Sequence, residues 1–388
     1  MKERIYSPNI ILLLVASLLF PACPMLVTPL IAGFSGTVGV SPKLAGLVSG
    51  AMYLCALICR PIVGNLADRV SKYRMTLCGT ILMAAACLGY FFAVSPVCLI
   101  LMRFVHGVGF ACCTVCMSTW LSYMLPKERV GSGVSLYGMM NALSMAIAPA
   151  IGVTIYQASG YRQAFLVAMM FSLLTLVAIQ FVSDRGEIRP ATPGISPGHA
   201  AGKLHFVEKN VLPIAIIVML FGIPYCATQS FLVNYTEARS LQITVNLYFP
   251  FHAVVLVALR LLLKKSFDRL SFRVLMFESS ACALLGILCL AFMNSDLLMF
   301  LAAAFMAGGY GIMCSASQVK AILLAGERNR GLANSTYYLG MDLGLTLGPT
   351  VGGLLFGSID LAWFYPILLV TVPLGLLTYF IGSRKVPL

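Results

Sequence analysis

The sequence predicts an all-α integral membrane protein whose twelve transmembrane helices form two pseudo-symmetric bundles of six. Three observations predict this fold class. First, 60% of the 388 residues are hydrophobic and the mean hydropathy is +0.94, well above the values of soluble domains. Second, apolar runs of roughly 20 residues, the length that crosses a bilayer as a helix, recur along the whole chain. Third, features of the first half return later at a constant offset.

Twelve apolar runs qualify as spans. The first follows Lys2 and Arg4 and continues past Phe20 without a small-residue cleavage site, so we expect a retained helix rather than a removed signal peptide. The predicted spans are 9–32, 44–66, 75–94, 97–124, 132–157, 162–183, 210–234, 242–264, 273–293, 297–324, 332–357 and 361–382.

The basic residues predict the topology. The net charge is +13, and placing both termini in the cytoplasm puts 19 of the 26 Lys and Arg on that side. Only Lys43, Arg162 and Arg239 then lie in external loops. This bias explains the basic composition without a nucleic acid as partner. We expect a multi-pass protein of a bacterial inner or plasma membrane, in contact with membrane lipids and monomeric.

The chain divides at one polar segment rich in Pro, Gly and charge. This segment predicts a cytoplasmic linker, 184–209, between an N-terminal six-helix bundle, 1–183, and a C-terminal six-helix bundle, 210–388. An offset of about 200 residues aligns Arg60 with Arg260, Asp68 with Asp268 and Pro149 with Pro349. The two bundles are therefore expected to be an internal duplication.

Three motifs resemble those of one family. Residues 64–74, GNLADRVSKYR, resemble the loop motif between helices 2 and 3 of the major facilitator superfamily, with Ser71 at a position where glycine is usual. Residues 103–109, RFVHGVG, are similar to its fourth-helix motif, with His106 in place of glutamine. Residues 137–152, YGMMNALSMAIAPAIG, resemble part of the fifth-helix motif of its drug and proton antiporter branch. The resemblance covers the whole chain and implies the major facilitator fold.

The resemblance implies a conformational latch at the loop motif. A carboxylate at Asp68 is suited to the N-terminal end of a helix, where N–H groups lack partners. The family suggests that this partner is the eleventh helix, beginning near Leu332. For Lys72 and Arg74, we favour a role as topology-determining charges over a role in the latch. The latch residues are Gly64, Asp68, Arg69, Arg74, Asp268 and Arg269.

Small residues at helical spacing in the fifth and eleventh spans predict close helix packing in lipid. A seam on which the halves rock is the functional alternative. The residues of this motif are Gly138, Pro149, Gly152, Gly344, Gly348, Pro349 and Gly352.

In a transporter of this family, the substrate is expected near the midplane between the halves. We expect the first helix to be broken by Pro21, Pro24 and Pro29, and the seventh by Gly222 and Pro224, so that both line the cavity. Further cavity candidates supply neutral hydrogen bonds: Tyr53, Tyr137, Asn141, Gln229, Asn334 and Tyr338.

Charges within the spans each need a reason, because insertion scales set their cost at roughly 2.5 to 3.5 kcal/mol. Arg60 and Arg260 occupy equivalent positions in the two halves. Glu278 is a candidate partner for Arg273 or Arg60. Arg103 and Asp342 fall in the middle third of the bilayer. They either pair or face the cavity, where Arg103 binds an anionic substrate and Asp342 carries a proton.

His106 lies one helical turn from Arg103 and is a candidate for proton coupling. The alternative is a buried neutral imidazole hydrogen-bonded to a helix carbonyl. His252 receives the same two interpretations.

No metal or cofactor is expected. The 13 cysteines lie mostly within spans, and the densest cluster, Cys112, Cys113 and Cys116, lacks a nearby carboxylate, which favours apolar packing over a thiolate metal site.

The sequence predicts a non-enzymatic secondary active transporter that works by alternating access. Proton-coupled efflux, as an antiporter, of a small amphipathic or anionic organic compound or drug is the leading hypothesis, with protons as the coupling ion. The sequence contains no phosphate-binding loop of the G-x-x-x-x-G-K-[ST] type, so we do not expect ATP hydrolysis to drive the transport. The alternatives are a uniporter or a proton-coupled uptake carrier for a small metabolite, a non-transporting receptor or scaffold, and a membrane enzyme.

Overall fold

The fold was taken from a computed structural model that describes residues 7–40, 42–187, 206–263, 266–326, 329–384 and 386. The described residues form helices and no strands, which confirms the all-α prediction. They group into two compact units. Unit 1 falls within Met1–Arg129, Tyr137–Phe206 and Glu327–Ser335, and unit 2 falls within Val130–Leu136, Val207–Gly326 and Thr336–Leu388. Residues 130–136 therefore group with unit 2, although the helix that they begin, Val130–Ser159, continues in unit 1. Residues 330–335 group with unit 1, although their helix, Arg330–Ser358, continues in unit 2.

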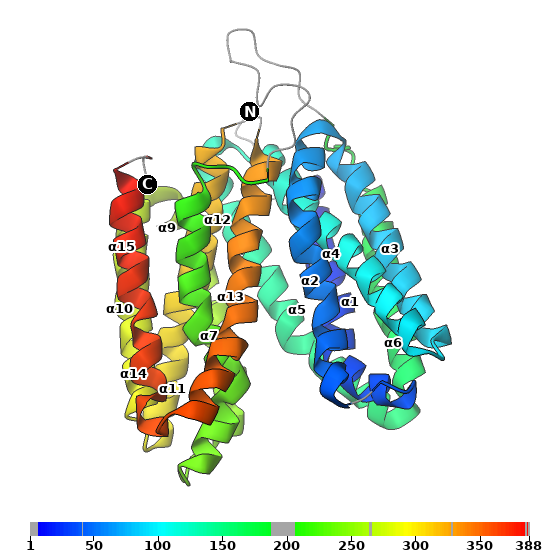
Figure 1. Cartoon of the computed structure of the whole chain (residues 1–388). Coiled ribbons are helices and arrows are strands. Elements are labelled where there is room, and N and C mark those ends of the chain that lie inside the picture. The colour runs from blue at the N-terminus through cyan, green and yellow to red at the C-terminus, as the bar shows by residue number, and fades with distance from the viewer. Residues whose placement is uncertain are drawn as a thin grey trace. The chain divides into compact units, whose positions relative to one another are not determined.

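Unit 1 is built around six long helices (Figure 1). In chain order they are α1 (Pro8–Thr37), α2 (Pro42–Arg69), α3 (Lys72–Phe92), α4 (Pro96–Met124), α5 (Val130–Ser159) and α6 (Tyr161–Gln180), with the short helix η1 (Lys127–Arg129) before α5. Helix α4 packs most extensively on α3 and α2, while α6 packs on α1 and α3. As a result, α4 is buried without interruption from Gly109 to Ser122.

Unit 2 repeats the pattern with more interruptions. Its helices are α7 (Leu212–Ala238), η2 (Val245–Leu247), α8 (Tyr248–Leu262), α9 (Ser266–Arg269), α10 (Phe272–Ala291), α11 (Asp296–Met306), the π-helical turn η3 (Ala307–Gly311), α12 (Ile312–Leu324), α13 (Arg330–Ser358), η4 (Leu361–Trp363), α14 (Phe364–Leu369) and α15 (Thr371–Ser383). Its core is a cluster of apolar side chains from α7, α10, α11 and α14.

The helix boundaries carry the repeat seen in the sequence. Helices α3, α4 and α5 begin at residues 72, 96 and 130, and α10, α11 and α13 begin at residues 272, 296 and 330. Each pair is separated by the same 200 positions, which agrees with the offset found from the motifs.

Eleven helices among the described residues are long and apolar enough to cross a membrane. The remaining predicted span, 242–264, contains the shorter apolar helix Tyr248–Leu262. It is shorter because the chain leaves α7 through Ser240, at φ 52°, and resumes only with the turn η2.

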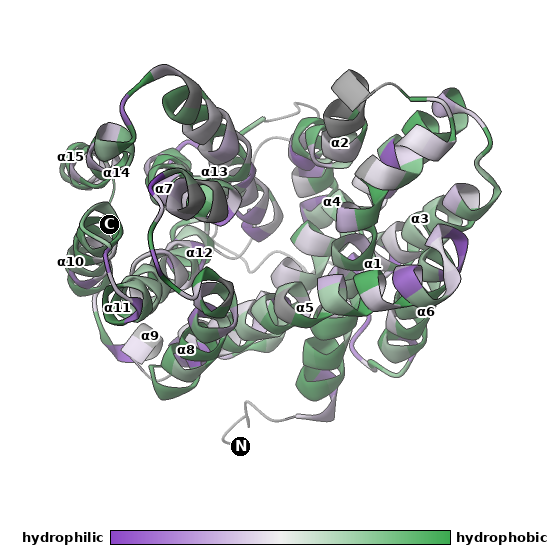
Figure 2. Ribbon diagram, turned by 90° about the horizontal axis from the view of Figure 1, so that it is seen from below, coloured by the Kyte–Doolittle hydropathy of each residue, from purple (hydrophilic) through white to green (hydrophobic). Residues whose placement is uncertain are grey.

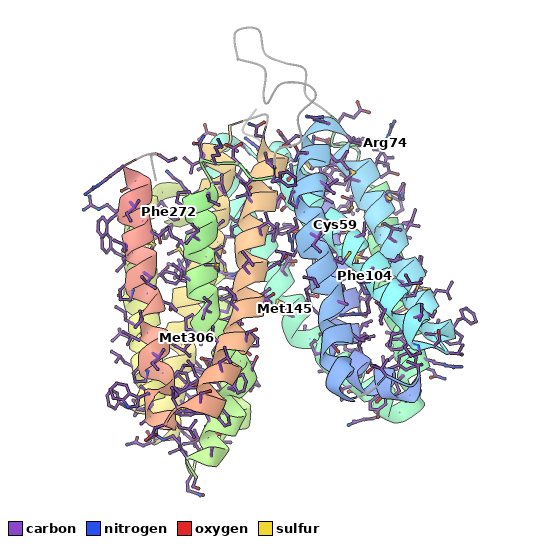
Figure 3. All side chains as sticks on the ribbon, viewed as in Figure 1. Cys59, Arg74, Phe104, Met145, Phe272 and Met306 are labelled. Atoms are coloured by element: carbon purple, nitrogen blue, oxygen red, sulfur yellow. The ribbon has the colours of Figure 1, made fainter. Side chains whose placement is uncertain are left out.

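The outer faces of the helices are apolar, as lipid requires. Leu54, Ile58, Ile62 and Leu66 are exposed and recur every four residues along one face of α2. Colouring by hydropathy shows hydrophobic residues along most of the helices (Figure 2). Among the side chains labelled in Figure 3, Phe104 and Met145 are exposed in the same way.

The proline residues do not interrupt their helices. We expected α1 and α7 to break at their Pro and Gly residues, and this expectation is wrong, since both helices are continuous. Thr28 Oγ1 donates to the Pro24 carbonyl at 2.7 Å, and Thr228 Oγ1 donates to the Pro224 carbonyl at 2.8 Å. These bonds go to the carbonyls of the prolines themselves, whereas the carbonyls that Pro24 and Pro224 leave without an N–H donor are those of Phe20 and Leu220.

The small residues of α13 lie where that helix meets α7. A Cβ atom added at Gly348 would lie 2.5 Å from Cys226 Cβ and 2.9 Å from the Ile223 carbonyl. At Gly344 it would lie 3.0 Å from the Met219 carbonyl. In unit 1, Gly152 brings α5 equally close to the Leu26 carbonyl of α1. Helix α5 also continues through Pro149, and α13 through Pro349.

We predict that Gly348→Ala lowers the stability of the protein by about 1 to 3 kcal/mol, because the added methyl group forces α7 and α13 apart. Gly353→Ala is the control, since its Cβ meets Phe231 at an ordinary 3.4 Å. Thermal melting in detergent measures both. Equal melting temperatures for the two variants would contradict the close packing described.

Candidate functional site

The Asp68 carboxylate caps the first turn of α13. Its Oδ1 accepts a hydrogen bond from the Gly331 N–H at 2.7 Å, and its Oδ2 accepts one from the Leu332 N–H at 2.9 Å. All three residues belong to unit 1. The N–H groups of a first turn have no partner within their own helix, and the helix dipole favours a negative charge there. The half-buried carboxylate therefore satisfies two backbone donors at once.

Two glycines allow this approach. A Cβ atom at Gly331 would lie 2.7 Å from the Gly64 carbonyl and 2.9 Å from Asp68 Oδ1. A Cβ atom at Gly64 would lie 2.5 Å from Ser335 Cβ. Any side chain at either position would push the start of α13 away from the end of α2.

Side chains of α13 extend the contact. Arg330 Nη1 donates to the Ser122 carbonyl, Asn334 Nδ2 donates to Thr119 Oγ1 at 3.0 Å, and Ser335 Oγ donates to the Arg60 carbonyl at 2.5 Å. The guanidinium of Arg330 and the ammonium of Lys72 both lie 4.9 Å from the Tyr123 ring centroid. This set of contacts, centred on Asp68, is called the α13 cap below.

The remaining loop residues have other surroundings. Ser71, at the position where the family motif has glycine, caps α3: its Oγ accepts from the Arg74 N–H at 3.4 Å and donates to the Arg185 carbonyl at 2.7 Å. Arg69 and Arg74 are exposed. Arg269 is exposed at the end of α9, and the Asp268 side chain lies outside the described residues.

Arg103 is fully buried on α4, and each of its three nitrogens has an acceptor within unit 1. Nε donates to the Val48 carbonyl at 3.2 Å, Nη2 donates to the Ser49 carbonyl, and Nη1 lies 3.8 Å from Met52 Sδ. The guanidinium therefore ties α4 to α2.

Asp342 is buried on α13, in the part of this helix that belongs to unit 2, and is 3% exposed. Its backbone carbonyl accepts a hydrogen bond from Thr346 Oγ1 at 2.8 Å. Glu278 is exposed on α10. Within the described part of unit 2 it makes no ion pair, so the expected pairing with Arg273 is absent. Arg273 instead lies over the Phe277 ring at 6.0 Å.

The two predicted histidines are buried in different ways. His252 Nδ1 lies 3.1 Å from the Ala303 carbonyl and therefore carries a proton, and its ring stacks on Tyr248. This is the hydrogen-bonded imidazole given as the alternative above. His106 contacts side chains instead: Tyr90 Oη lies 3.1 Å from Nδ1, and Cys23 Sγ lies 3.8 Å from Nε2.

Arg60 and Arg260 occupy equivalent places in the repeat but have different partners. Arg60 is fully buried on α2, and its Nη1 donates to Thr114 Oγ1 at 2.9 Å. Arg260, on α8, is 8% exposed, and its Nε and Nη1 have no hydrogen-bond partner among the residues that the structure describes. The position equivalent to Thr114, 200 residues later, is Cys314. A thiol is a weaker acceptor than a hydroxyl, so the replacement removes the partner that Arg60 has.

Four residues lie within electrostatic range of Arg260. They are Cys314, Tyr337, Tyr310 and Tyr225. The rings of Tyr225 and Tyr310 stack with their centroids 4.2 Å apart. All of these residues belong to unit 2. Arg260 together with these three tyrosines and Cys314 is called the Arg260 cluster below.

The other cavity candidates lie in several places. Tyr53 Oη is 3.4 Å from Thr28 Oγ1, and Tyr338 Oη accepts from Gln318 Nε2 at 3.2 Å. Pro24 and Tyr137 are buried, whereas Gly138, Asn141 and Gln229 are half-buried. Asn334 belongs to the α13 cap.

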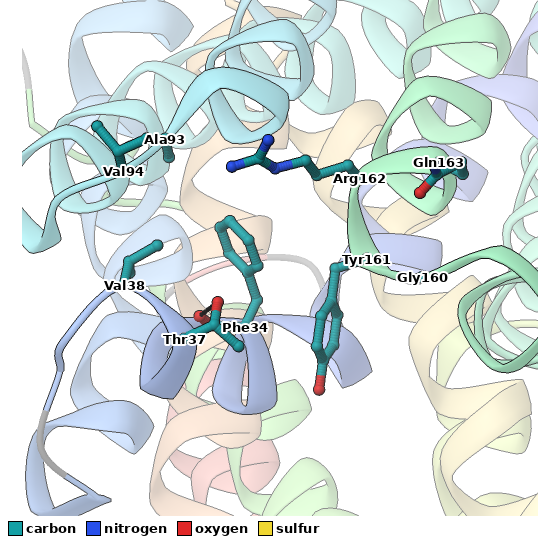
Figure 4. Close-up of a pocket in the computed structure, with 9 residues that line it drawn as sticks. All are labelled: Phe34, Thr37, Val38, Ala93, Val94, Gly160, Tyr161, Arg162 and Gln163. Carbon is teal, nitrogen blue, oxygen red and sulfur yellow. Dashed lines mark hydrogen bonds between the residues drawn. The ribbon is translucent and has the colours of Figure 1, made fainter.

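A pocket with a volume of about 450 Å³ opens at one end of unit 1 (Figure 4). Phe34 and Thr37 of α1 line it, together with the segment from Gly160 to Gln163. None of the predicted site residues lines this pocket. Its one charged side chain is Arg162.

Sequence reasoning missed three features of these sites. The role of Arg330, Thr119 and Ser122 in the α13 cap depends on contacts between residues far apart in sequence. The difference between Thr114 and Cys314 was readable from the repeat once the offset was known. The contact of Cys23 with His106 had no signal in the sequence.

Comparison with known proteins gives one family. The model described as "Major Facilitator Superfamily" matches residues 12–325 and 268–387. The staphylopine export protein of Staphylococcus aureus is 25% identical over 240 residues, which cover 58% of each chain. A homolog of the multidrug resistance efflux pump PmrA from Lactococcus lactis is 27% identical over 146 residues, 38% of this chain and 36% of that protein. The chain thus matches less than two thirds of the length of either relative.

Among solved structures, the human organic anion transporter MFSD10 superposes with a TM-score of 0.75 at 15% identity, over 97% of this chain and 99% of that one. At this identity the likeness concerns the fold alone.

We predict that Asp68→Asn weakens the α13 cap by about 1 to 2 kcal/mol, because the amide keeps one acceptor, presents a donor to the second N–H and removes the charge. The exchange of backbone amide hydrogens at Gly331 and Leu332, followed by mass spectrometry, should become faster.

The control is Asp296→Asn, whose half-buried carboxylate at the start of α11 also accepts two hydrogen bonds, from the Thr244 N–H and hydroxyl. Unchanged exchange at the start of α13 in the Asp68 variant would contradict the role given to this carboxylate.

Proposed function

The chain belongs to the major facilitator superfamily and is a multi-pass membrane transporter of a small-molecule substrate, and on that premise we propose its substrate class and mechanism. We propose that it is a secondary active transporter that works by alternating access and exports a small amphipathic organic anion in exchange for protons. Both termini lie in the cytoplasm in this proposal, as the distribution of basic residues favours.

The observation that carries the proposal is the Arg260 cluster. A buried charge without hydrogen-bond partners costs several kcal/mol, so a protein that keeps one needs a compensating interaction. A carboxylate, sulfonate or phosphate group would accept a charge-assisted hydrogen bond from the guanidinium, through Nε or Nη1.

The surroundings of Arg260 favour an organic anion over an inorganic one. The stacked rings of Tyr225 and Tyr310 offer apolar faces, and tyrosine hydroxyls offer further donors at their edges. Ligand sites commonly combine a mainly apolar lining with a few polar groups that fix orientation. An amphipathic molecule with one acidic group matches this combination.

The α13 cap supplies the conformational element of the proposal. The cap is made of backbone hydrogen bonds to one carboxylate and of contacts that two glycines permit, so it forms or is lost as a unit. We assign its formation to one state of the transport cycle and its loss to the other. Arg69 and Arg74, both exposed, are assigned to the membrane surface and to topology.

The direction of transport and the coupling ion are inferred from two sources. The staphylopine export protein and the PmrA homolog bear names that denote export. Asp342 is a buried carboxyl group in a membrane helix, and such groups commonly carry protons in transporters. Proton-coupled uptake or uniport is the alternative, and transport assays with imposed gradients distinguish them.

We predict that anion binding depends on Arg260. Salicylate and its neutral amide, salicylamide, form a matched pair of probes. Salicylate should raise the melting temperature of the purified protein, and salicylamide should not. Arg260→Gln should abolish this difference. A melting curve that responds equally to both probes, or an unchanged response of the Arg260 variant, would remove the cluster from substrate binding.

Position 314 gives the matched pair of variants for this test. Cys314→Thr supplies the hydroxyl acceptor that Arg60 has at Thr114, and should weaken salicylate binding about 10-fold, because a hydrogen bond to a charged group contributes roughly 1.5 to 3 kcal/mol. Cys314→Ala removes the thiol without supplying an acceptor, so its affinity should stay within about 3-fold of the wild type, equivalent to less than about 0.7 kcal/mol.

We predict that Asp342→Asn abolishes transport driven by a proton gradient in proteoliposomes but leaves exchange of labelled for unlabelled salicylate measurable, since exchange needs no net proton movement. Asp360→Asn is the control, because Asp360 is exposed and caps the turn η4. Gradient-driven transport that persists in the Asp342 variant would exclude this carboxyl group from the proton route.

A further inference from the structure

Three metal-ligating side chains meet in the buried part of unit 1. Cys23 of α1, Cys87 of α3 and His106 of α4 place their ligand atoms within 4.8 Å of one another, and all three residues are 0% exposed. The Cys23 and Cys87 sulfurs are 3.5 Å apart, and His106 Nε2 is 3.8 Å from Cys23 Sγ. These residues form the only such group of three found among the described residues.

The spacing suits one metal ion. An ion that bonds to two sulfurs at about 2.3 Å each spans sulfurs up to about 4.6 Å apart, and a sulfur and an imidazole nitrogen up to about 4.3 Å apart. Both measured distances fall within these limits. The remaining distance, from Cys87 Sγ to the ligating nitrogen of His106, is at most 4.8 Å. It needs to shorten by at most about 0.5 Å to meet the limit for one ion.

A neighbouring hydrogen bond turns the correct nitrogen of His106 toward the sulfurs. Tyr90 Oη donates its one proton to the Met102 carbonyl at 3.3 Å. It is therefore left to accept from His106 Nδ1–H at 3.1 Å. This arrangement keeps the lone pair on Nε2, which faces Cys23 Sγ. Metal-binding histidines are commonly fixed in this way by a partner on the other ring nitrogen.

We propose that Cys23, Cys87 and His106 bind one copper(I) ion. Soft thiolate ligands select copper(I) and zinc, but a zinc site requires a fourth ligand, either a protein group or water. No Asp, Glu or further Cys or His joins the three in the described residues, and the cluster is enclosed. Three ligands without water satisfy copper(I).

The electrostatics of the cluster support a monovalent ion with two thiolates. Binding releases one proton from each thiol and gives a complex of net charge −1. Arg103 lies one helical turn before His106 in α4, close enough to interact with it electrostatically, and offsets that charge. The bound ion would link α1 to α3 and α4 and so stabilise unit 1.

The test uses the full-length protein in detergent, with thiols kept reduced and oxygen excluded. Copper(I) is titrated in competition with bicinchoninate, and X-ray absorption identifies the ligands of the bound ion. We expect one ion per chain, with two sulfur ligands and one nitrogen ligand, and a higher melting temperature for the loaded protein. The absorption measurement needs no variant, so it does not depend on whether a variant folds.

Variants test the ligand assignment. Cys23→Ser, Cys87→Ser and His106→Gln should each weaken copper(I) binding by at least about 100-fold, and Tyr90→Phe by about 10- to 100-fold with the stoichiometry unchanged. Cys113→Ser is the matched control, because Cys113 is also buried on α4, its Sγ donates to the Thr76 carbonyl, and it is not among the three ligating side chains. Its affinity should equal that of the wild type.

Three outcomes would overturn the proposal. The first is a reduced, folded wild-type protein that takes up no copper(I). The second is uptake that survives both serine variants. The third is a site that prefers zinc and shows a fourth ligand, which would contradict the choice of ion.

Discussion

The constraint on which this structure depends is that polar groups buried among membrane helices need partners within the protein. Arg103 meets it with two carbonyls and a thioether, and Arg60 with a threonine hydroxyl. The backbone donors at the start of α13 meet it with the Asp68 carboxylate. Where the constraint is satisfied, polar residues act as fixed ties between helices. The Arg260 cluster, in which two guanidinium nitrogens have no hydrogen-bond partner among the described residues, departs from this rule. It is therefore where a ligand is proposed to complete the set of partners.

The duplication shows how such a difference arises. The two halves share helix boundaries at an offset of 200 residues and share an arginine at equivalent positions. Arg60 has the Thr114 hydroxyl as its partner, whereas the equivalent position carries the Cys314 thiol, and two donors of Arg260 lack a partner in the part of the chain that the structure describes. The same fold thus supports a structural role in one half and, as we propose, a binding role in the other.

Much of the fold was predictable from the sequence, because helix length in lipid is set by bilayer thickness and the pattern of apolar runs is strong. The resemblance to the family correctly indicated the superfamily and directed attention to Asp68. The prediction of broken helices at Pro24 and Pro224 was wrong, since proline shows that a hydrogen bond is lost but not which groups compensate. Cys23, Cys87 and His106 are far apart in sequence and lie on three helices, so only coordinates bring them together. The difference between Arg60 and Arg260 was also hidden, although position 314 carried a readable signal.

The most direct test of the central claim is an experimental structure of the protein in lipid nanodiscs with salicylate bound. The account predicts the carboxylate of salicylate at hydrogen-bonding distance from Nε or Nη1 of Arg260, with its ring against Tyr225 or Tyr310. A bound anion elsewhere, with the Arg260 guanidinium hydrogen-bonded to a protein group, would contradict it.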